Sequence, residues 1–332
     1  MVIVLDGVSD VSKTTLFVFA ALSLIPLAWL IGEATEHLAV HTGPGVGGFL
    51  NATFGNAPEL IIALIAVNNG LGVVVRGSLV GSVVGNTLLV LGFSLTFGRG
   101  GEVDRVSAFT SLGLVALATA LFFVPASAGW LGHHGHKTII TTTVPAAIAL
   151  LALYIAVTWR SLRRHHRQHV SDLPASVHAW PLPFSLATLA AATVVTAFVA
   201  EIVVHTIDAF ATEAHLSDFF VAAVIVAIAG NAAEHGGAVV VAARGHLDLA
   251  AEIALSSASQ VAVFLIPAIA LVSWLVNPLA LSFRPVELIA LMASVAIVTA
   301  LFASRRFGRR HGVALIVTYF AVALAFFLAG RS

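Results

Sequence analysis

The sequence predicts an all-α integral membrane protein with about ten transmembrane helices arranged as two inverted five-helix repeats. Three observations lead to this fold class. Hydrophobic residues make up 59% of the 332 residues and charged residues only 10%, whereas soluble domains carry about 25% charged residues. One polar stretch divides the apolar chain into two similar halves, and one short motif occurs once in each half. The chain is therefore suited to lipid, and its halves are related.

The apolar stretches are long enough to cross a bilayer. A hydrocarbon core of ~30 Å requires ~20 apolar residues per helix, and Gly, Pro, Arg or His residues separate stretches of about this length. On that measure we expect ten spans, at 14–36, 46–68, 74–98, 106–125, 138–159, 181–207, 218–243, 248–275, 284–304 and 311–330.

The polar stretch between the fifth and sixth spans sets the domain boundaries. It is rich in Arg and His, which favours a solvated linker. We expect an N-terminal tail at 1–13, a first repeat at 14–159, a linker at 160–180 and a second repeat at 181–332.

The orientation follows from the distribution of Lys and Arg, which favour cytoplasmic loops. Loops after odd-numbered spans hold eleven Arg residues, against five Lys or Arg on the opposite side. We therefore expect a multi-pass protein of the cell (inner) membrane, with a cytoplasmic linker and both termini outside. Five spans per half is an odd number, so the second half enters the membrane from the opposite side and the repeats are inverted.

The repeated motif is GNAPE at residues 55–59 and GNAAE at residues 230–234. The offset of 175 also pairs Gly70 with Gly245 and Ser82 with Ser257. Inverted repeats of this kind are typical of secondary transporters, whose ion sites lie near the bilayer midplane at interrupted helices.

Glycine and proline predict where the helices are interrupted. Gly55 and Pro58 weaken the second span, and Gly230, Gly236 and Gly237 weaken the seventh. Such interruptions free backbone carbonyls to face a cavity. The carbonyls of Gly55 and Gly230 are therefore candidate cation ligands.

The side chains of the motif suit a hard divalent cation. Ca²⁺ binds 6–8 oxygens from carboxylates, amides, backbone carbonyls and water. Asn56 and Glu59 are three residues apart, as are Asn231 and Glu234, so each pair shares a helix face. Hydroxyl groups from the neighbouring spans would be added by Ser82 and Ser257.

Two carboxylates in a low dielectric also predict proton binding. Desolvation and mutual repulsion favour protonation of the empty site, whereas a bound cation favours the ionised form. Protons and cation therefore compete for the same two groups, Glu59 and Glu234. Such competition couples inward proton flux to outward cation flux, which is antiport.

Four segments resemble the cation/proton exchangers of the calcium:cation antiporter superfamily. They are GEATEH at 32–37, GGFLNATFGNAPELI at 47–61, GSVVGN at 81–86 and GNAAEH at 230–235. The resemblance implies that Glu59 and Glu234 coordinate Ca²⁺ and exchange it for H⁺, while the first and sixth spans rock against a core of spans two, three, seven and eight. It also places five residues along the site or its access paths: Asn56, Asn231, Ser82, Ser257 and Gln260.

The sequence departs from this family at two places near the motif. Pro58 stands where many relatives have a small apolar residue, and Ser256 stands where glycine is usual. Both positions bear on helix bending or ion selectivity.

Each candidate has a structural alternative. Glu59 and Glu234 could be carboxylates hydrogen-bonded between helices, but a duplicated Glu within matched breaks favours transport. The two Asn residues could serve only as helix-to-helix hydrogen bonds. For Ser82, Ser257 and Gln260, ligation and structural bonding are equally compatible with the sequence.

Three further residues are candidates for gating or proton tuning. Glu33 and Glu201 each precede a histidine by four residues, but interfacial residues that snorkel toward water are commoner than gates. His235 adjoins Glu234 and titrates near neutral pH, although a packing role is equally compatible.

Two histidine clusters, 133–136 and 165–169, could bind Zn²⁺ or sense pH, although such loops are more often simply solvated. No cofactor motif occurs, and the expected partners are Ca²⁺, protons and the lipid bilayer. A net charge of zero argues against nucleic-acid binding. A homo-oligomer is compatible with the sequence.

The main alternative function is a Na⁺-coupled exchanger or a cation channel that uses the same carboxylates. An intramembrane enzyme is disfavoured because the sequence lacks a His-Glu-x-x-His motif and any nucleophile–base pattern.

Overall fold

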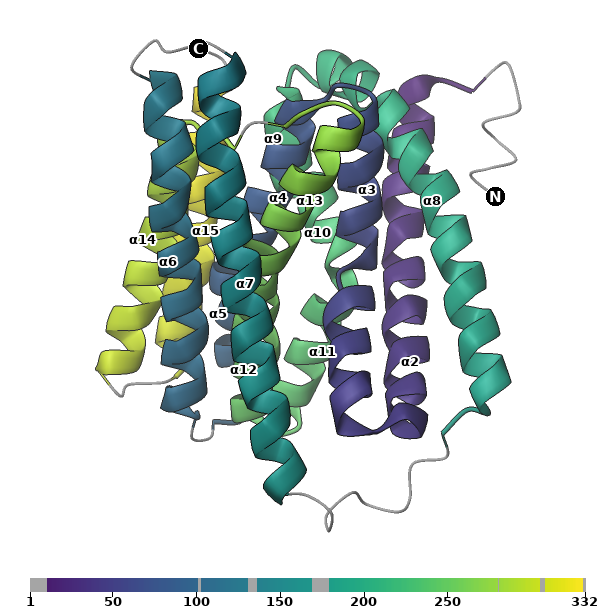
Figure 1. The fold of residues 1–332 in the computed structure, drawn as a ribbon, viewed down its shortest axis with the longest axis vertical. Helices are drawn as coiled ribbons and strands as arrows, with labels where there is room; N and C mark the ends of the chain where they lie inside the picture. The colour runs from purple at the N-terminus through teal and green to yellow at the C-terminus, as the bar shows by residue number, and fades with distance from the viewer. Residues whose placement is uncertain are drawn as a thin grey trace.

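The computed structural model describes residues 11–100, 103–130, 136–168, 179–279, 281–304 and 308–330. Within these residues every regular element is helical and no strand occurs. The helices run up and down side by side, and the chain begins its first helix and ends its last one at the same, upper end of Figure 1. The predicted fold class is confirmed.

The first repeat begins with one long helical element that contains more than one span. The first span is Lys13–Thr42, and the rest of the element turns back and rises toward the next helix (Figure 1). The elements are α2 (Lys13–Phe54), α3 (Ala57–Asn68), α4 (Gly72–Val84), the π-helix η1 (Gly85–Val90), α5 (Leu91–Phe97), α6 (Arg105–Trp130) and α7 (His136–Gln168).

The end of α7 differs from the expected boundary of the linker. The helix continues to Gln168, so residues 160–168 are helical, and residues 169–178 of the expected linker lie outside the described part of the chain. The linker as a connection between helices therefore begins later than the Arg/His composition predicts.

The second repeat repeats this order. Its elements are α8 (Leu182–Glu213), α9 (Asp218–Phe220), the π-helix η2 (Val221–Val226), α10 (Ala227–Gly230), α11 (Ala232–Ala243), α12 (Leu247–Gln260), the π-helix η3 (Val261–Leu265), α13 (Ile266–Val272), the 3₁₀-helix η4 (Ser273–Leu275), α14 (Pro285–Ala303) and α15 (Arg309–Ala329).

Eight helical stretches among the described residues are long and apolar enough to cross a membrane, and a bent pair at 218–243 makes a ninth. The twelve residues of α3 are too few to span alone. This helix completes its span with the end of α2. The two broken spans are thus the second and the seventh, where the motif lies.

The inverted repeats are visible in the helix boundaries. α3 and α11 begin and end 175 residues apart, as do α5 and α13, and π-helices η1 and η3 occupy matching places between them. The turns that follow α3 and α11 contain Gly70 and Gly245, with φ of 73° and 98°. Only glycine adopts such angles without strain, which explains why this residue recurs in both turns.

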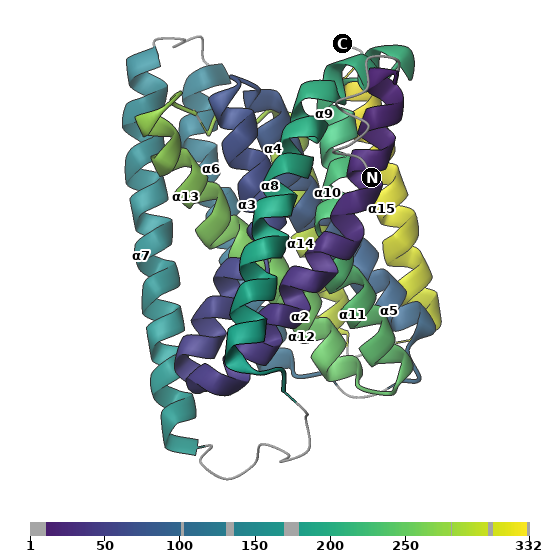
Figure 2. The same ribbon diagram turned by 90° about the vertical axis from the view of Figure 1, so that its right-hand side faces the viewer.

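Burial identifies the centre of the bundle. Within its most apolar window, the third span (Gly72–Phe97) is 89% buried and the eighth (Leu247–Leu275) is 67% buried, whereas α15 is only 28% buried. The third and eighth spans therefore form the core around which the others pack. α2 and α8 lie side by side along one flank (Figures 1 and 2).

Candidate ion-binding site

Both broken spans are interrupted by an asparagine. Asn56 lies between α2 and α3 with φ −97° and ψ 19°, and Asn231 lies between α10 and α11 with φ −92° and ψ 12°. The helices on either side of Asn231 are bent by 57°. Each Asn is the N-cap of the following helix, but neither side chain caps it. Both amides are therefore directed to other helices.

Two details of the predicted interruptions need correction. Gly236 and Gly237 do not interrupt the seventh span, because both lie inside α11. Pro58 occupies the first turn of α3, where proline removes no helical hydrogen bond, so it fits the start of the helix without bending it. The first break contains Gly55, as predicted, together with Asn56, and the second contains Asn231.

The two glutamates are each the third residue of a half-helix that starts at a break, Glu59 in α3 and Glu234 in α11. The first turn of a helix carries partial positive charge from its free N–H groups and favours a carboxylate. The inverted topology brings both first turns to the middle of the bundle from opposite directions.

Glu59 is a buried carboxylate without a hydrogen-bond partner among the described residues. Its side chain lies against Gly230, where an added Cβ would be 3.7 Å from Oε1. The residue is 3% exposed, and both carboxylate oxygens are buried and unpaired. A buried charge without a partner is costly. Glu59 therefore requires a proton or a cation at this place.

Glu234 comes from the other repeat and is less enclosed. It is half-buried, and its Oε2 is buried without a hydrogen-bond partner in the described part of the chain. Glu59 lies against Gly230, the last residue of α10, and Glu234 follows in the first turn of α11 across the break. The two carboxylates therefore belong to one electrostatic site, although they are 175 residues apart in the sequence.

Asn231 is the centre of a hydrogen-bonded network between the repeats. Its Nδ2 donates to Ser82 Oγ at 2.7 Å and to the Ala227 carbonyl at 2.8 Å. Its Oδ1 accepts from Asn86 Nδ2 at 3.1 Å, and Asn86 also donates to Ser257 Oγ at 3.2 Å. The network joins the third, seventh and eighth spans.

Asn56 makes the corresponding contact from the first repeat. Its Nδ2 donates to Gln260 Oε1 at 3.1 Å, and Gln260 Nε2 donates to Ser256 Oγ at 3.2 Å. Each motif asparagine thus bonds to an amide on a core span of the opposite repeat. Ser256 therefore holds the amide that Asn56 contacts.

Asn86 belongs to the site but is absent from the sequence-based set of candidates. It is fully buried, and its Oδ1 has no hydrogen-bond partner among the described residues. The sequence holds two signals that could have identified it. Asn86 is an amide within a strongly apolar span, and it lies in the segment that resembles the exchanger family.

The residues considered for gating lie in different surroundings. Glu33 Oε1 is 3.3 Å from His37 Nε2. In the second repeat, His205 Nδ1 lies 2.8 Å from the backbone carbonyl of Glu201. His235 Nε2 is buried without a hydrogen-bond partner among the described residues.

No group of three or more His, Cys, Asp or Glu side chains positioned for a metal occurs among the described residues. The predicted histidine clusters at 133–136 and 165–169 lie outside the residues whose side chains are described. The oxygens available to a cation are therefore the two carboxylates together with the amides, hydroxyls and carbonyls around them.

An ion site enclosed between inverted repeats at two broken helices is the arrangement of secondary transporters. The chain belongs to the sodium/calcium exchanger protein family, whose model matches residues 12–163 and 184–328.

Individual relatives cover nearly the whole chain. The Ca²⁺/H⁺ antiporter ChaA of Bacillus subtilis is 34% identical over 326 residues, which cover 95% of this chain and 93% of that protein. The vacuolar calcium ion transporter of Schizosaccharomyces pombe is 36% identical over 327 residues, covering 94% and 79%. The structure of native YfkE matches with a TM-score of 0.85 and 31% identity, covering 98% and 96%.

Proposed function

We propose that this chain is a secondary transporter that exchanges Ca²⁺ for H⁺ across a membrane. The observation that carries the proposal is the pair Glu59 and Glu234 beside the two breaks, whose buried oxygens have no hydrogen-bond partner among the described residues. Amide and hydroxyl groups bonded to Asn56 and Asn231 surround the breaks. Support also comes from relatives named as Ca²⁺/H⁺ antiporters and calcium transporters.

The mechanism follows from the negative charge of the two buried carboxylates, which must be neutralised. When the site is empty, burial and repulsion make them bind protons; a Ca²⁺ ion supplies enough positive charge to displace these protons. Either occupant neutralises the site, but the two cannot bind together. The proton gradient therefore drives Ca²⁺ in the opposite direction when the site opens to each side in turn.

The surrounding polar residues complete the coordination in this proposal. Asn56, Asn231, Ser82, Ser257 and Gln260 would supply or orient oxygens. The carbonyls of Gly55 and Gly230 are further candidate ligands beside the breaks, and His235, Glu33 and Glu201 are candidates for proton tuning or gating. α2 and α8, which pack together on one flank, would move against the core.

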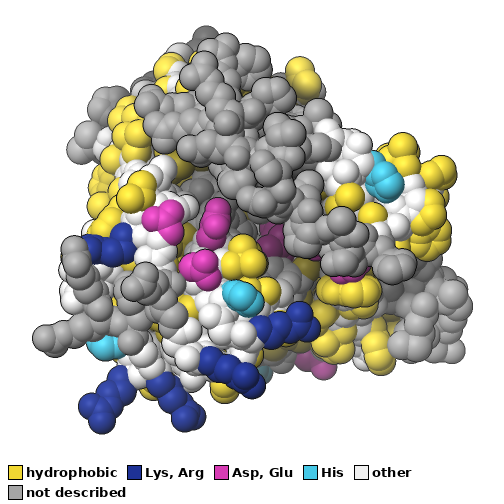
Figure 3. All heavy atoms as spheres, turned by 90° about the horizontal axis from the view of Figure 1, so that it is seen from below, with side chains coloured by type: hydrophobic (Ala, Val, Ile, Leu, Met, Phe, Trp, Pro, Cys, Tyr) yellow, Lys and Arg dark blue, Asp and Glu magenta, His cyan; other side chains and the backbone are white. Residues whose placement is uncertain are grey.

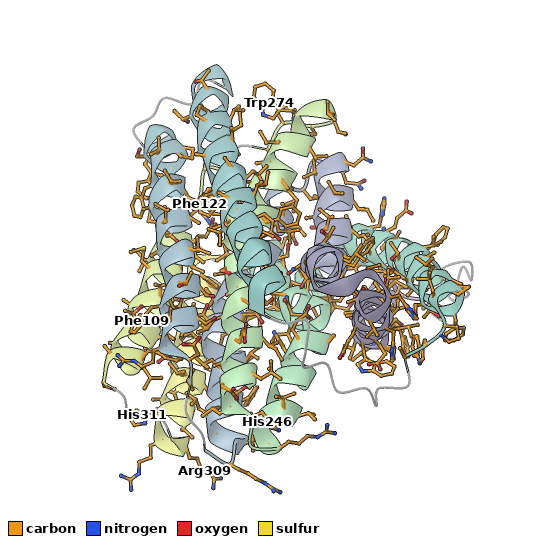
Figure 4. The ribbon with its side chains drawn as sticks, turned by 60° about the horizontal axis from the view of Figure 1, so that its bottom comes forward. Phe109, Phe122, His246, Trp274, Arg309 and His311 are labelled. Atoms are coloured by element: carbon orange, nitrogen blue, oxygen red, sulfur yellow. The ribbon has the colours of Figure 1, made fainter. Side chains whose placement is uncertain are left out.

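We assign the lower end of the molecule to the cytoplasm. Arg309, His246 and His311 lie at this end, opposite Trp274 (Figure 4). Figure 3 shows that this face also carries a group of acidic side chains beside Lys and Arg side chains. Positive residues favour the cytoplasmic side; in this proposal both termini are outside and the linker, 160–180, is inside. The repeats would be 14–159 and 181–332, in a cell membrane.

A Na⁺-coupled exchanger is the second candidate, and the family description, which names sodium as well as calcium, favours keeping it in the test. The same carboxylates could bind Na⁺ in place of H⁺. The two functions differ in the ion whose gradient drives Ca²⁺ movement.

The test is Ca²⁺ uptake into proteoliposomes under an imposed pH gradient without Na⁺. We expect uptake by the wild-type protein that a protonophore abolishes, and no uptake by Glu234→Gln. The apparent affinity for Ca²⁺ should rise with pH, because fewer protons then compete for the carboxylates.

The matched control is Glu252→Gln, which removes an exposed carboxylate on α12. This variant should transport like the wild type. Uptake that requires a Na⁺ gradient would reassign the coupling ion, and full uptake by Glu234→Gln would refute the two-carboxylate mechanism.

A further inference from the structure

A second set of buried charges lies near the upper end of the bundle, away from the ion-binding site. Glu287, in the first turn of α14, is fully buried. It accepts hydrogen bonds from Arg284 Nε at 2.8 Å and from the Arg284 backbone N–H at 3.1 Å. Arg76 on α4 places its Nε 3.7 Å from Glu287 Oε2. We call these three residues the upper ion cluster.

The upper ion cluster is costly to maintain in a membrane protein. Charged residues within spans are expensive, and removing one partner of a buried pair leaves the other uncompensated. Arg284 also interacts with groups outside the cluster. The Arg284 guanidinium lies 4.2 Å from the centre of the Phe219 ring, and its Nη1 donates to the Ala329 carbonyl at 3.5 Å. The cluster thus joins α4, α9, α14 and α15.

The contact with Phe219 holds α9 against α4 where the two backbones already touch. An added Cβ at Gly77 would lie 2.9 Å from the Phe219 carbonyl oxygen, and one at Gly81 would lie 2.0 Å from the Ala223 carbonyl oxygen. No side chain fits between the helices at these points. The relative height of α4 and the first half of the seventh span is therefore set by close backbone contact and by the ion cluster above it.

The position of α4 along its axis, relative to the first half of the seventh span, determines whether one hydrogen bond in the ion-binding site can form. Ser82 follows Gly81 directly and accepts the hydrogen bond from Asn231, which ends the first half of the seventh span. Ser82 is six positions after Arg76, which corresponds to about 9 Å along a helix at ~1.5 Å per residue. A shift of α4 along its axis would be transmitted over this short distance.

The inverted counterpart of this cluster is missing in the described residues. The position 175 residues after Arg76 is Ala251, and the position 175 before Glu287 is Leu112; both are buried and apolar. Among the described residues, buried charges of this kind therefore lie beside the second motif and not at the matching place beside the first.

We propose that Arg76 and Glu287, together with Arg284, are positioning residues for the second ion-binding motif. They fix α4 against α9 and η2 so that Ser82 and Asn231 remain hydrogen-bonded at the ion site. This inference rests on the proposed function, because it concerns the same site.

The test compares the double variant Arg76→Met/Glu287→Leu with the wild type. The double variant removes one buried charge of each sign. Arg284 loses its carboxylate partner, but its side chain is 36% exposed and keeps its contacts with the Phe219 ring and the Ala329 carbonyl, so we expect the protein to fold. The single variants Arg76→Met and Glu287→Gln should lower the melting temperature more than the double variant. Arg105→Met is the matched control, since it removes an Arg that lies over an aromatic ring, 5.5 Å from the Phe109 centroid, on another helix.

Two readouts separate positioning from folding. In the double variant, KM for Ca²⁺ in uptake driven by a pH gradient should rise roughly five- to tenfold, the factor for one hydrogen bond of ordinary net strength. Vmax per folded protein should change less. The Ca²⁺ concentration needed to raise the melting temperature should increase by the same factor. The single variant Arg76→Lys, which keeps the positive charge, should show a smaller increase in both KM and this concentration.

A double variant with wild-type KM and wild-type Ca²⁺ stabilisation would overturn the inference, as would an equal rise in Arg105→Met. Failure of the proposed function is seen separately, as absence of uptake driven by the pH gradient in the wild type. In that case Ca²⁺ stabilisation still tests the cluster, because it does not depend on the coupling ion.

Discussion

The two copies of the motif have the same local structure but different surroundings. Asn56 and Asn231 have nearly equal backbone angles, and each precedes a twelve-residue helix. Yet Ala57, Pro58 and Glu59 are buried, whereas the matching residues 232–234 are half-buried. Beyond them, an added Cβ at Gly236 or Gly237 would meet no atom within 4 Å. The two motifs match in conformation, but the second is more exposed than the first.

This difference indicates how one sequence motif serves both sides of a membrane. In the opposite state, the first motif would have the more exposed packing and the second motif the more buried packing. Neither α3 nor α11 would need to change its own conformation. Inverted repeats make two such states similar in energy. We infer that the asymmetry between the motifs belongs to one state of the transport cycle, and the following predictions test this inference.

The largest expected effect is the loss of exchange in both Glu59→Gln and Glu234→Gln. Each substitution keeps the size of the side chain but removes a group that must alternate between a proton and Ca²⁺. Uptake under a pH gradient should fall to the level of protein-free vesicles in both variants. Retained uptake in one variant alone would show that the two motifs differ in chemistry as well as in surroundings.

The second prediction uses the absence of cysteine from the chain. Ala57 and Ala232 are matched first residues of α3 and α11, but Ala57 is only 5% exposed and Ala232 is half-buried. In inside-out vesicles, an impermeant maleimide should label Ala232→Cys well before Ala57→Cys. Ca²⁺ should slow the reaction at Ala232→Cys. Equal labelling rates would mean that the first motif is as accessible as the second.

The third prediction concerns the amides that reach each motif from the core spans. Each amide makes two side-chain hydrogen bonds, but Asn86 is fully buried with an unpaired Oδ1, whereas Gln260, which bonds Asn56 and Ser256, is half-buried. Asn86→Ala should therefore cost more, about 2 kcal/mol of stability for a buried network left without its donor. Thermal unfolding of the two alanine variants in the same detergent compares them. A larger loss for Gln260→Ala would reverse the ranking.

The smallest expected effect is at Ser256, which matches Gly81 at the offset of 175. The glycine allows α4 to touch η2, whereas the serine holds the Gln260 amide at 3.2 Å. Ser256→Gly should raise KM for Ca²⁺ by about fivefold, since one hydrogen bond contributes roughly 1 kcal/mol. Ser256→Thr, which keeps the hydroxyl, is the control. An unchanged KM would show that Gln260 is oriented without the serine.

The sequence determined the membrane class and the all-helical fold with inverted repeats. It predicted ten spans, whereas the described residues contain eight helices long enough to span, or nine with the bent pair. A membrane span must be long enough to cross the bilayer and must contain few charged residues. Both requirements act on short stretches of chain, so they are visible in the sequence alone. The positions of both breaks also followed from the motif, although the glycines inside α11 were wrongly expected to contribute.

Only the tertiary structure decided which groups meet. Asn56 and Gln260 are 204 residues apart, and Asn86 and Asn231 are 145 apart. The burial of Glu59, the openness around Glu234 and the upper ion cluster likewise depend on helices from different parts of the chain. Such contacts are set by the packing of whole helices, and local composition and periodicity carry no information about it.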